Sequence, residues 1–234
     1  MLPGLAVRLS ETAVLAVIGP SGSGKSSVLR AGLLPALWTG KLPGVAVGTT
    51  ISMTPGAHPL EELAVRVGME SGVAAGLLLD DWRVHPDRLR LGLRQVSAKA
   101  PATRLFLLVD QLEEVFTLCS DEAERRTFIR ALTAAVSDPD TPVSVVLGMR
   151  ADFYARCAEY PELVEVIQDR QVLVGPMTAA ELREAITGPA EQAGLVLEPG
   201  LVETMLADLG EEPGSLPLLS HALFATWQQR RAGR

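Results

Sequence analysis

Nine consecutive residues near the start of the chain have the types and spacing of a phosphate-binding loop. They are Gly19, Pro20, Ser21, Gly22, Ser23, Gly24, Lys25, Ser26 and Ser27. The first eight fit the pattern G-x-x-x-x-G-K-[ST], in which glycines let successive backbone N–H groups point at a polyphosphate. In this chemistry Lys25 reaches the β- and γ-phosphates, while the Ser26 hydroxyl binds Mg²⁺. The loop therefore predicts a nucleoside triphosphate site.

The residues on either side of the loop fit the strand and the helix that it requires. The apolar run Val14 to Ile18 predicts a buried strand, and residues 26–34 have helical spacing. A helix that begins at the loop adds the partial positive charge of its N-terminus to the phosphate site.

Acidic residues follow a second apolar run, Leu105 to Val109, which predicts a central strand. The carboxyl ends of parallel strands share one edge of the sheet, so Asp110 is expected near the phosphate loop. Asp110 is then placed to bind Mg²⁺ through water, and Glu113 or Glu114 to orient or deprotonate the attacking water. The sequence leaves open which glutamate acts, and solvated acids at a strand end are the alternative.

A third strand is predicted over Val143 to Met149, and Arg150 follows it. A guanidinium at this edge suits the oxygens of a γ-phosphate. The alternatives are a surface cap, or a pair between Arg150 and Asp152.

The order of these patterns predicts an α/β fold with two domains. Val45 to Met53 and Gln171 to Val174 are weaker strand candidates. We expect a parallel-sheet P-loop NTPase domain with three layers, α/β/α, over residues 1–174. Three helical patterns without a strand then predict a small helical domain over residues 175–234. Capping patterns start two helices, at Asp121 with Glu124 and at Thr178 with Glu181.

Composition narrows the class of protein. The 234 residues are 47% apolar and carry a formal net charge of −7, which argues against direct nucleic-acid binding. No apolar run approaches the roughly 20 residues of a membrane span, and no signal peptide is recognisable. Cys119 and Cys157 are expected as reduced thiols, and the three scattered histidines give no zinc pattern. We expect a cytoplasmic protein.

Several linked motifs together resemble the STAND class of P-loop ATPases. The resemblance runs from about Leu15 to Trp227 and rests on GPSGSGKSS, AGLLPAL, LLVDQLEEVFT, a strand ending in Arg-Ala-Asp-Phe-Tyr, GPAEQAGL and GSLPLLSHAL. More narrowly, the set is similar to the bacterial "novel STAND" type, which is related to NACHT and NB-ARC domains.

The resemblance implies a signalling switch in which ADP holds a closed state and exchange for ATP opens a state competent for assembly. It implies slow Mg²⁺-dependent hydrolysis, and partners that include other copies of the chain and fused sensor or effector modules such as WD40 repeats. The family's elements fall on the Walker A loop Gly19 to Ser27, the Walker B acids Asp110, Glu113 and Glu114, the sensor-one Arg150, and Pro217, which packs near the adenine.

Two elements of the family lie outside the resemblance. The 18 residues before Gly19 lack its adenine-side h-h-G-R-E motif, and the winged-helix segment expected after Trp227 is absent. We therefore expect an excised core or a minimal member of the family.

The residues by themselves leave three alternative functions to consider. A transport ATPase of the ABC type needs an LSGGQ-like signature, which the sequence lacks. A nucleotide or small-molecule kinase shares the loop. Two features argue against a kinase: the acids after the second strand suit hydrolysis, and no Arg-rich lid is evident. A scaffold with structural ADP and no turnover is the third alternative.

Overall fold

The computed structural model describes residues 2–40, 47–100, 103–137, 142–209, 214 and 216–229. Contacts between Cα atoms divide the chain into two units. The first comprises Met1–Ile18 and Lys25–Leu173, and the second comprises Gly19–Gly24 and Val174–Arg234.

The first unit is built on a five-stranded sheet with the order β2-β3-β4-β1-β5. Its strands are β1 (Val14–Gly19), β2 (Val47–Met53), β3 (Arg104–Val109), β4 (Val143–Arg150) and β5 (Gln171–Leu173). The β1–β5, β2–β3 and β3–β4 pairs are parallel. Positions 45 and 46 of the strand predicted to begin at Val45 lie outside the described residues. The strand order places β4 between β3 and β1, so the residues that follow these three strands share one edge.

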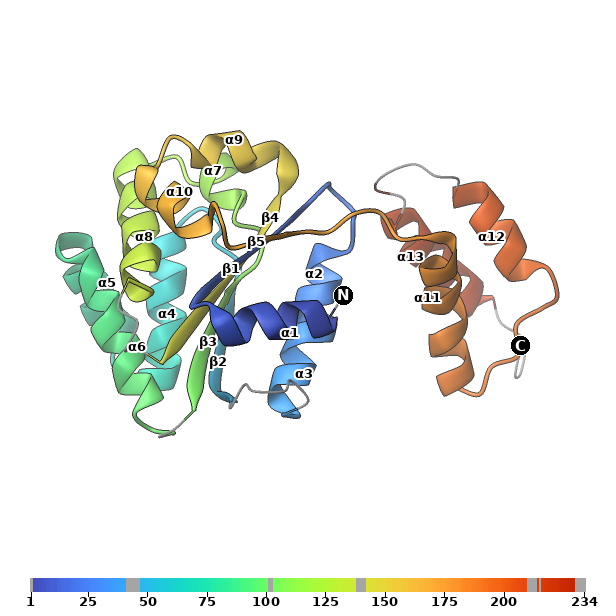
Figure 1. Ribbon diagram of the computed structural model, residues 1–234, viewed down its shortest axis with the longest axis horizontal. Coiled ribbons are helices and arrows are strands. Elements are labelled where there is room, and N and C mark those ends of the chain that lie inside the picture. Colours follow the sequence, from blue (N-terminus) through green and yellow to red (C-terminus); the bar gives the residue numbers. More distant parts are fainter. Residues whose placement is uncertain are drawn as a thin grey trace. The chain divides into compact units, whose positions relative to one another are not determined.

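Helices cover both faces of this sheet (Figure 1), which gives the three-layer arrangement predicted from the sequence. One face carries α1 (Leu2–Glu11) and a continuous helical run of α2 (Lys25–Ser27), the π-helical η1 (Val28–Leu33) and α3 (Leu34–Trp38). The other face carries α4 (Pro59–Ser71), α6 (Leu89–Ser97), α8 (Glu122–Ala135) and α10 (Pro161–Ile167), with α5 (Ala75–Val84) and the 3₁₀ turn η2 (Pro86–Arg88) packed on that layer.

The strands are buried on both faces, which explains why they read as unbroken apolar runs. Val14, Ala16 and Ile18 join the core beneath α4, α6 and α8. Leu15 and Val17 alternate with them and are fully buried toward the opposite layer. Apolar packing on two sides fixes the strand ends, and therefore fixes the residues that follow them.

The first turn of α8 differs in detail from its predicted start. Asp121 caps the helix as expected, because its carboxylate accepts a 2.8 Å hydrogen bond from the backbone N–H of Ala123. Glu124 does not complete a capping box. Its carboxylate accepts from the N–H of Leu60 instead (3.3 Å) and lies 3.5 Å from Nδ1 of His58, so it links α8 to the start of α4.

The second unit contains α11 (Ala179–Gln192), α12 (Leu201–Leu209) and α13 (Leu216–Gln228). Leu182, Ile186, Val202 and Leu219 form its small core. The predicted capping box at the start of α11 is present: Thr178 Oγ1 accepts from the N–H of Glu181 (3.2 Å), and Glu181 accepts from the N–H of Thr178 (2.9 Å). Within the described ranges, no helix has the length and apolar character to span a membrane.

Candidate nucleotide-binding site

The chain takes the order of strand, glycine turn and helix that the phosphate-loop pattern requires. β1 ends at Gly19, and α2 begins at Lys25. Gly22 (φ 69°) and Gly24 (φ 87°) lie in the left-handed region of backbone space, where a side chain would strain the turn. The hydroxyl of Ser23 between them is buried and has no hydrogen-bond partner in the described part of the chain.

Asp110 lies directly after β3 and meets the helix that follows the loop. Its Oδ1 accepts a hydrogen bond from Ser26 Oγ (3.1 Å) and another from the N–H of Gln111 (3.0 Å). Its Oδ2 accepts a hydrogen bond from Nε of Arg30 (2.7 Å), and the side chain is only 1% exposed. A buried carboxylate needs such partners, because an unpaired charge in the interior is costly.

Ser26 and Asp110 offer oxygen donors side by side, which is the donor set that Mg²⁺ prefers. No group of three or more His, Cys, Asp or Glu residues that could hold a metal is present among the residues that the structure describes. A magnesium site of the phosphate-loop type needs none, because substrate phosphates and waters fill its remaining positions. The residues present therefore fit Mg²⁺.

Gly148 on β4 makes room for this arrangement. A Cβ atom at this position would lie 2.6 Å from Cδ1 of Leu29 and 2.9 Å from Oδ1 of Asp110. Both distances are shorter than van der Waals contact. A larger residue would therefore displace the helix after the phosphate loop, the Asp110 carboxylate, or both.

The two adjacent glutamates point to different parts of the sheet edge. Oε2 of Glu113 accepts a 3.2 Å hydrogen bond from the backbone N–H of Arg150, at the end of β4. Oε2 of Glu114 accepts a 2.9 Å hydrogen bond from the N–H of Gly56, in the segment after β2. Because β4 is next to β1 and β2 is at the far edge, Glu113 is the glutamate on the side of β1.

Lys25 lies in a field set by the same residues. Burial lowers its pKa, because a charged amine is less stable away from water. The negative charge of Glu113 raises the pKa of Lys25, Arg150 lowers it, and Asp110 and then Asp152 raise it by smaller amounts. The lysine of the loop and the polar residues after β3 and β4 therefore form one electrostatic cluster.

Arg150 makes a two-point contact with Asp152 at this edge. Its Nε and Nη2 atoms lie 3.1 Å and 2.6 Å from the two carboxylate oxygens. This hydrogen-bonded pair raises the pKa of Arg150 and lowers the pKa of Asp152. Both side chains are exposed, so the pair can open into water at little cost.

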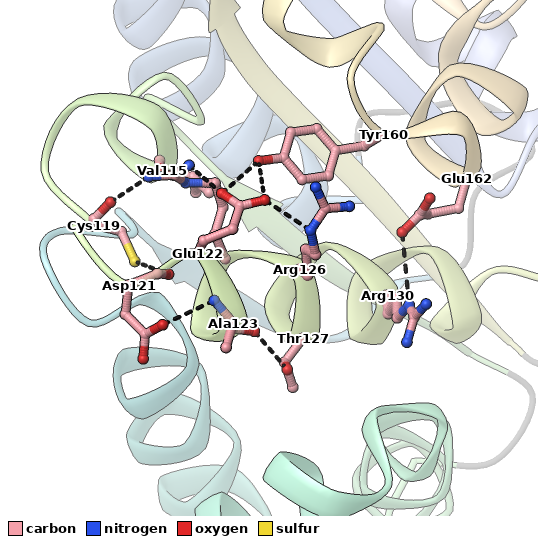
Figure 2. A network of polar contacts seen from close by, with 11 residues as sticks. Val115, Cys119, Asp121, Glu122, Ala123, Arg126, Thr127, Arg130, Tyr160 and Glu162 are labelled. Carbon is pink, nitrogen blue, oxygen red and sulfur yellow. Dashed lines mark hydrogen bonds and ion pairs between the residues drawn. The ribbon is translucent and has the colours of Figure 1, made fainter.

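A polar network holds the segment that carries the glutamates (Figure 2). Arg125 on α8 donates from Nε to the carbonyl of Val115 (2.9 Å) and from Nη2 to the carbonyl of Cys119 (2.6 Å). Glu122 pairs with Arg125 and accepts a 3.3 Å hydrogen bond from the hydroxyl of the buried Tyr160. The short helix α7 (Glu114–Thr117) is thereby tied to α8, and η3 (Ala151–Phe153) and α9 (Tyr154–Cys157) lead from β4 to Tyr160.

The predicted site residues are divided between the two units: Gly19–Gly24 and Pro217 belong to the second unit, and the others belong to the first. Lys25, Ser26, Asp110, Glu113 and Arg150 all belong to the first unit and interact as described. Pro217 lies in the first turn of α13, in the second unit.

Sequence reasoning missed three participants: Arg30, Gly148 and Thr54, whose Oγ1 accepts a 2.6 Å hydrogen bond from Nη2 of Arg30. Arg30 follows Ser26 by four residues, so its position one helical turn away was available as a signal. Thr54 and Gly148 carry no such signal, because their roles depend on which strands are neighbours.

A glycine turn joins the buried strand β1 to a helix, and an acid, Asp110, follows β3 in the same sheet. Together these features define the P-loop nucleoside triphosphatase fold. Residues 2–234 match Novel STAND NTPase 1, and the chain belongs to this family. The resemblance to novel STAND proteins is confirmed. A comparison with curated protein sequences found no match.

Solved structures share the fold at low sequence identity. The Aeropyrum pernix ORC1 protein in complex with DNA matches with a TM-score of 0.65 and 18% identity, over 98% of this chain and 60% of that chain. The ADP form of the Aeropyrum pernix ORC2 protein matches with a TM-score of 0.64 and 14% identity, over 100% of this chain and 65% of that one. Drosophila ORC bound to DNA matches with a TM-score of 0.55 and 14% identity, over 97% and 54%. The chain thus spans less than two thirds of the length of these proteins.

Proposed function

We propose that this chain is an ATP- and ADP-binding signalling switch that hydrolyses ATP slowly with Mg²⁺. The observation that carries the proposal is the hydrogen bond between Ser26 and the buried Asp110, next to a lysine whose charge is coupled to Glu113 and Arg150. Membership of an NTPase family supports the same conclusion.

Each residue of the cluster has a role in this proposal. Residues 19–27 bind the phosphates, and the Lys25 amine offsets their charge. Ser26 and Asp110 hold Mg²⁺, which when bound neutralises charge on the β- and γ-phosphate oxygens.

Glu113 is our candidate for the residue that orients the attacking water. It lies on the β1 side of the sheet edge, and the N–H of Arg150 fixes its Oε2 atom. Glu114 is engaged with Gly56 on the side of β2, so we assign it a structural role.

Arg150 is our candidate for the sensor of the γ-phosphate. Its guanidinium is held by Asp152, and a phosphate offers the same two-oxygen geometry. ATP competes with Asp152 for Arg150 in this scheme, whereas ADP leaves the pair intact. A difference in contacts between the two nucleotides is what a switch needs.

The remaining parts of the proposal come from the family resemblance. Pro217 contacts the adenine, ADP favours a closed state, and ATP favours assembly with other copies of the chain. Fused or associated sensor and effector modules, such as WD40 repeats, supply input and output. We place the protein in the cytoplasm, with no direct contact to nucleic acid or membrane.

The test is a titration of the purified chain with ADP and ATP by calorimetry, with and without Mg²⁺, followed by a measurement of ATP turnover. If the protein is a switch, it should bind both nucleotides, with high affinity for ADP. It should turn over ATP slowly, and an added nucleoside monophosphate should not change that rate. Faster turnover with a monophosphate indicates a kinase instead. Tight ADP with no turnover indicates a structural scaffold, and no binding at all refutes the proposal.

A further inference from the structure

Arg30 joins the candidate metal ligand Asp110 to the end of a distant strand. Its Nε lies 2.7 Å from Oδ2 of Asp110, and its Nη2 donates a 2.6 Å hydrogen bond to Oγ1 of Thr54, just after β2. Arg30 lies on the π-helical segment after the phosphate loop, and such segments are frequent at functional sites. None of the roles proposed above uses this residue.

The two partners of this ion pair differ in their access to water. The Asp110 side chain is 1% exposed, whereas the Arg30 side chain is 48% exposed. Asp110 also has two donors on Oδ1, from Ser26 and from the N–H of Gln111, while Arg30 holds Oδ2. The carboxylate is therefore fixed, and the guanidinium is the partner that can leave.

Mg²⁺ and the guanidinium compete for the same carboxylate. A divalent cation held by Ser26 and Asp110 would lie close to Arg30, which binds the same carboxylate, and the two positive charges would repel each other. Without the metal, the same guanidinium supplies the positive charge that a buried carboxylate needs.

We infer that Arg30 is a removable counter-ion of Asp110, which stabilises the metal-free site and yields when Mg²⁺ arrives with the nucleotide. The inference rests on the proposed function, because it assigns Mg²⁺ to Ser26 and Asp110. Thr54 acts as the second anchor of the guanidinium, and so couples the departure of Arg30 to the segment after β2.

The experiment measures ADP affinity by calorimetry across a series of Mg²⁺ concentrations, for the full chain and for Arg30→Gln. If the two cations compete, the Mg²⁺ concentration that gives half of the maximal change in ADP affinity should be about tenfold lower for Arg30→Gln than for the parent, because a repelling charge is removed. Without metal and nucleotide, the substitution should instead be unfavourable: Arg30→Gln should have a lower melting temperature than the parent. The difference in melting temperature should narrow when Mg²⁺ and ADP are added.

Two further variants make the test specific. Thr54→Val removes one anchor of the guanidinium and should shift the Mg²⁺ midpoint in the same direction by a smaller factor. Arg83→Gln removes an arginine from an exposed ion pair with Asp80 on α5 and should behave as the parent does. If Arg30→Gln fails to fold, Arg30→Met replaces it, because methionine also removes the positive charge and keeps an unbranched side chain that can pack as the arginine stem does.

The outcomes separate this inference from the proposed function. An unchanged or higher Mg²⁺ midpoint in Arg30→Gln, with ADP binding intact, overturns the counter-ion role alone. Failure of the parent protein to bind ADP at any Mg²⁺ concentration overturns the proposed function, and the inference with it.

Discussion

The backbone N–H of Arg150 donates a 3.2 Å hydrogen bond to Oε2 of Glu113, which joins the end of β4 to the segment after β3. Because β4 lies between β3 and β1, this bond holds the carboxylate on the β1 side of the sheet edge. Glu113 is also the charge that raises the pKa of Lys25 most, against the effect of burial. The arrangement gives the two adjacent glutamates different roles.

We expect Glu113→Gln to keep ATP bound but to lower its turnover by about 10²-fold, because general-base catalysis contributes roughly 10²–10⁴-fold. Glu114→Gln is the matched control. It weakens the hydrogen bond to Gly56 and should cost about 1 kcal/mol of the free energy of unfolding while turnover changes little. Single-turnover kinetics and urea unfolding measure the two effects. The reverse result, with Glu114→Gln slow and Glu113→Gln active, would show that our assignment is wrong.

Lys25→Met should weaken the binding of ADP and ATP by roughly ten- to a hundredfold, since a charge-assisted contact to phosphate contributes about 1.5–3 kcal/mol. The chain should still fold, because burial already disfavours the charged amine and the apolar core lies elsewhere. Calorimetry gives the affinities, and circular dichroism follows the fold. Affinity equal to that of the parent would contradict the phosphate-loop assignment.

Arg125→Met should destabilise the protein by about 2–3 kcal/mol, because it leaves the carbonyls of Val115 and Cys119 without their donor. The Arg125 side chain is 12% exposed, whereas that of Arg126 is 53% exposed, so Arg126→Met is a control one residue away. It removes a surface ion pair with Glu122 and should cost at most about 1 kcal/mol. Equal losses in urea unfolding would mean that the network in Figure 2 does not fix this segment.

The sequence alone predicted the features that depend on neighbouring residues better than those that depend on packing between distant elements. The phosphate loop, the apolar strands and the Thr178–Glu181 capping box depend on residues within one turn or one strand, and all appear where the patterns predicted them. The sequence analysis did not predict α4, α5 and α6, because their apolar stripes are short and these helices gain stability from packing on each other. α1 was not predicted, since Gly4 weakens the pattern, yet Leu5 and Leu9 one turn apart are buried and hold it.

The division of roles between Glu113 and Glu114 was beyond a sequence argument. Adjacent residues share the same spacing from Asp110, and only the order of the strands shows which one faces β1 and which one faces β2. The same holds for Gly148, which must be small because Leu29 and Asp110 come close to it from other elements.

The stability of the protein should fall in alkaline solution because of a buried thiol. Burial raises the pKa of Cys157 from 9.0 to about 12. Between these values the unfolded chain has lost the proton and the folded chain has kept it, so the free energy of unfolding decreases as pH rises. Cys157→Ala should be less stable at neutral pH, by about 1 kcal/mol for the cavity, but should lose less stability as the pH rises from 9.0. Urea unfolding across this range tests the difference, and parallel losses would exclude the thiol as the cause.

The last prediction concerns the nucleotide and the second unit. If Pro217 contacts the adenine, bound ADP should slow hydrogen exchange of amides in the first turns of α13 as well as in residues 19–27, since a bridging ligand stabilises the closed state by its differential affinity. ATP should give a different pattern in α13, because its γ-phosphate takes Arg150 from Asp152. Arg150→Ala should make the two patterns alike while ADP still binds, and Pro217→Ala should remove the ADP effect on α13 selectively. Protection confined to residues 19–27 in the parent would leave a nucleotide-binding protein and eliminate the switch, because a nucleotide that leaves α13 unaffected has no differential affinity through which to shift that helix between two states.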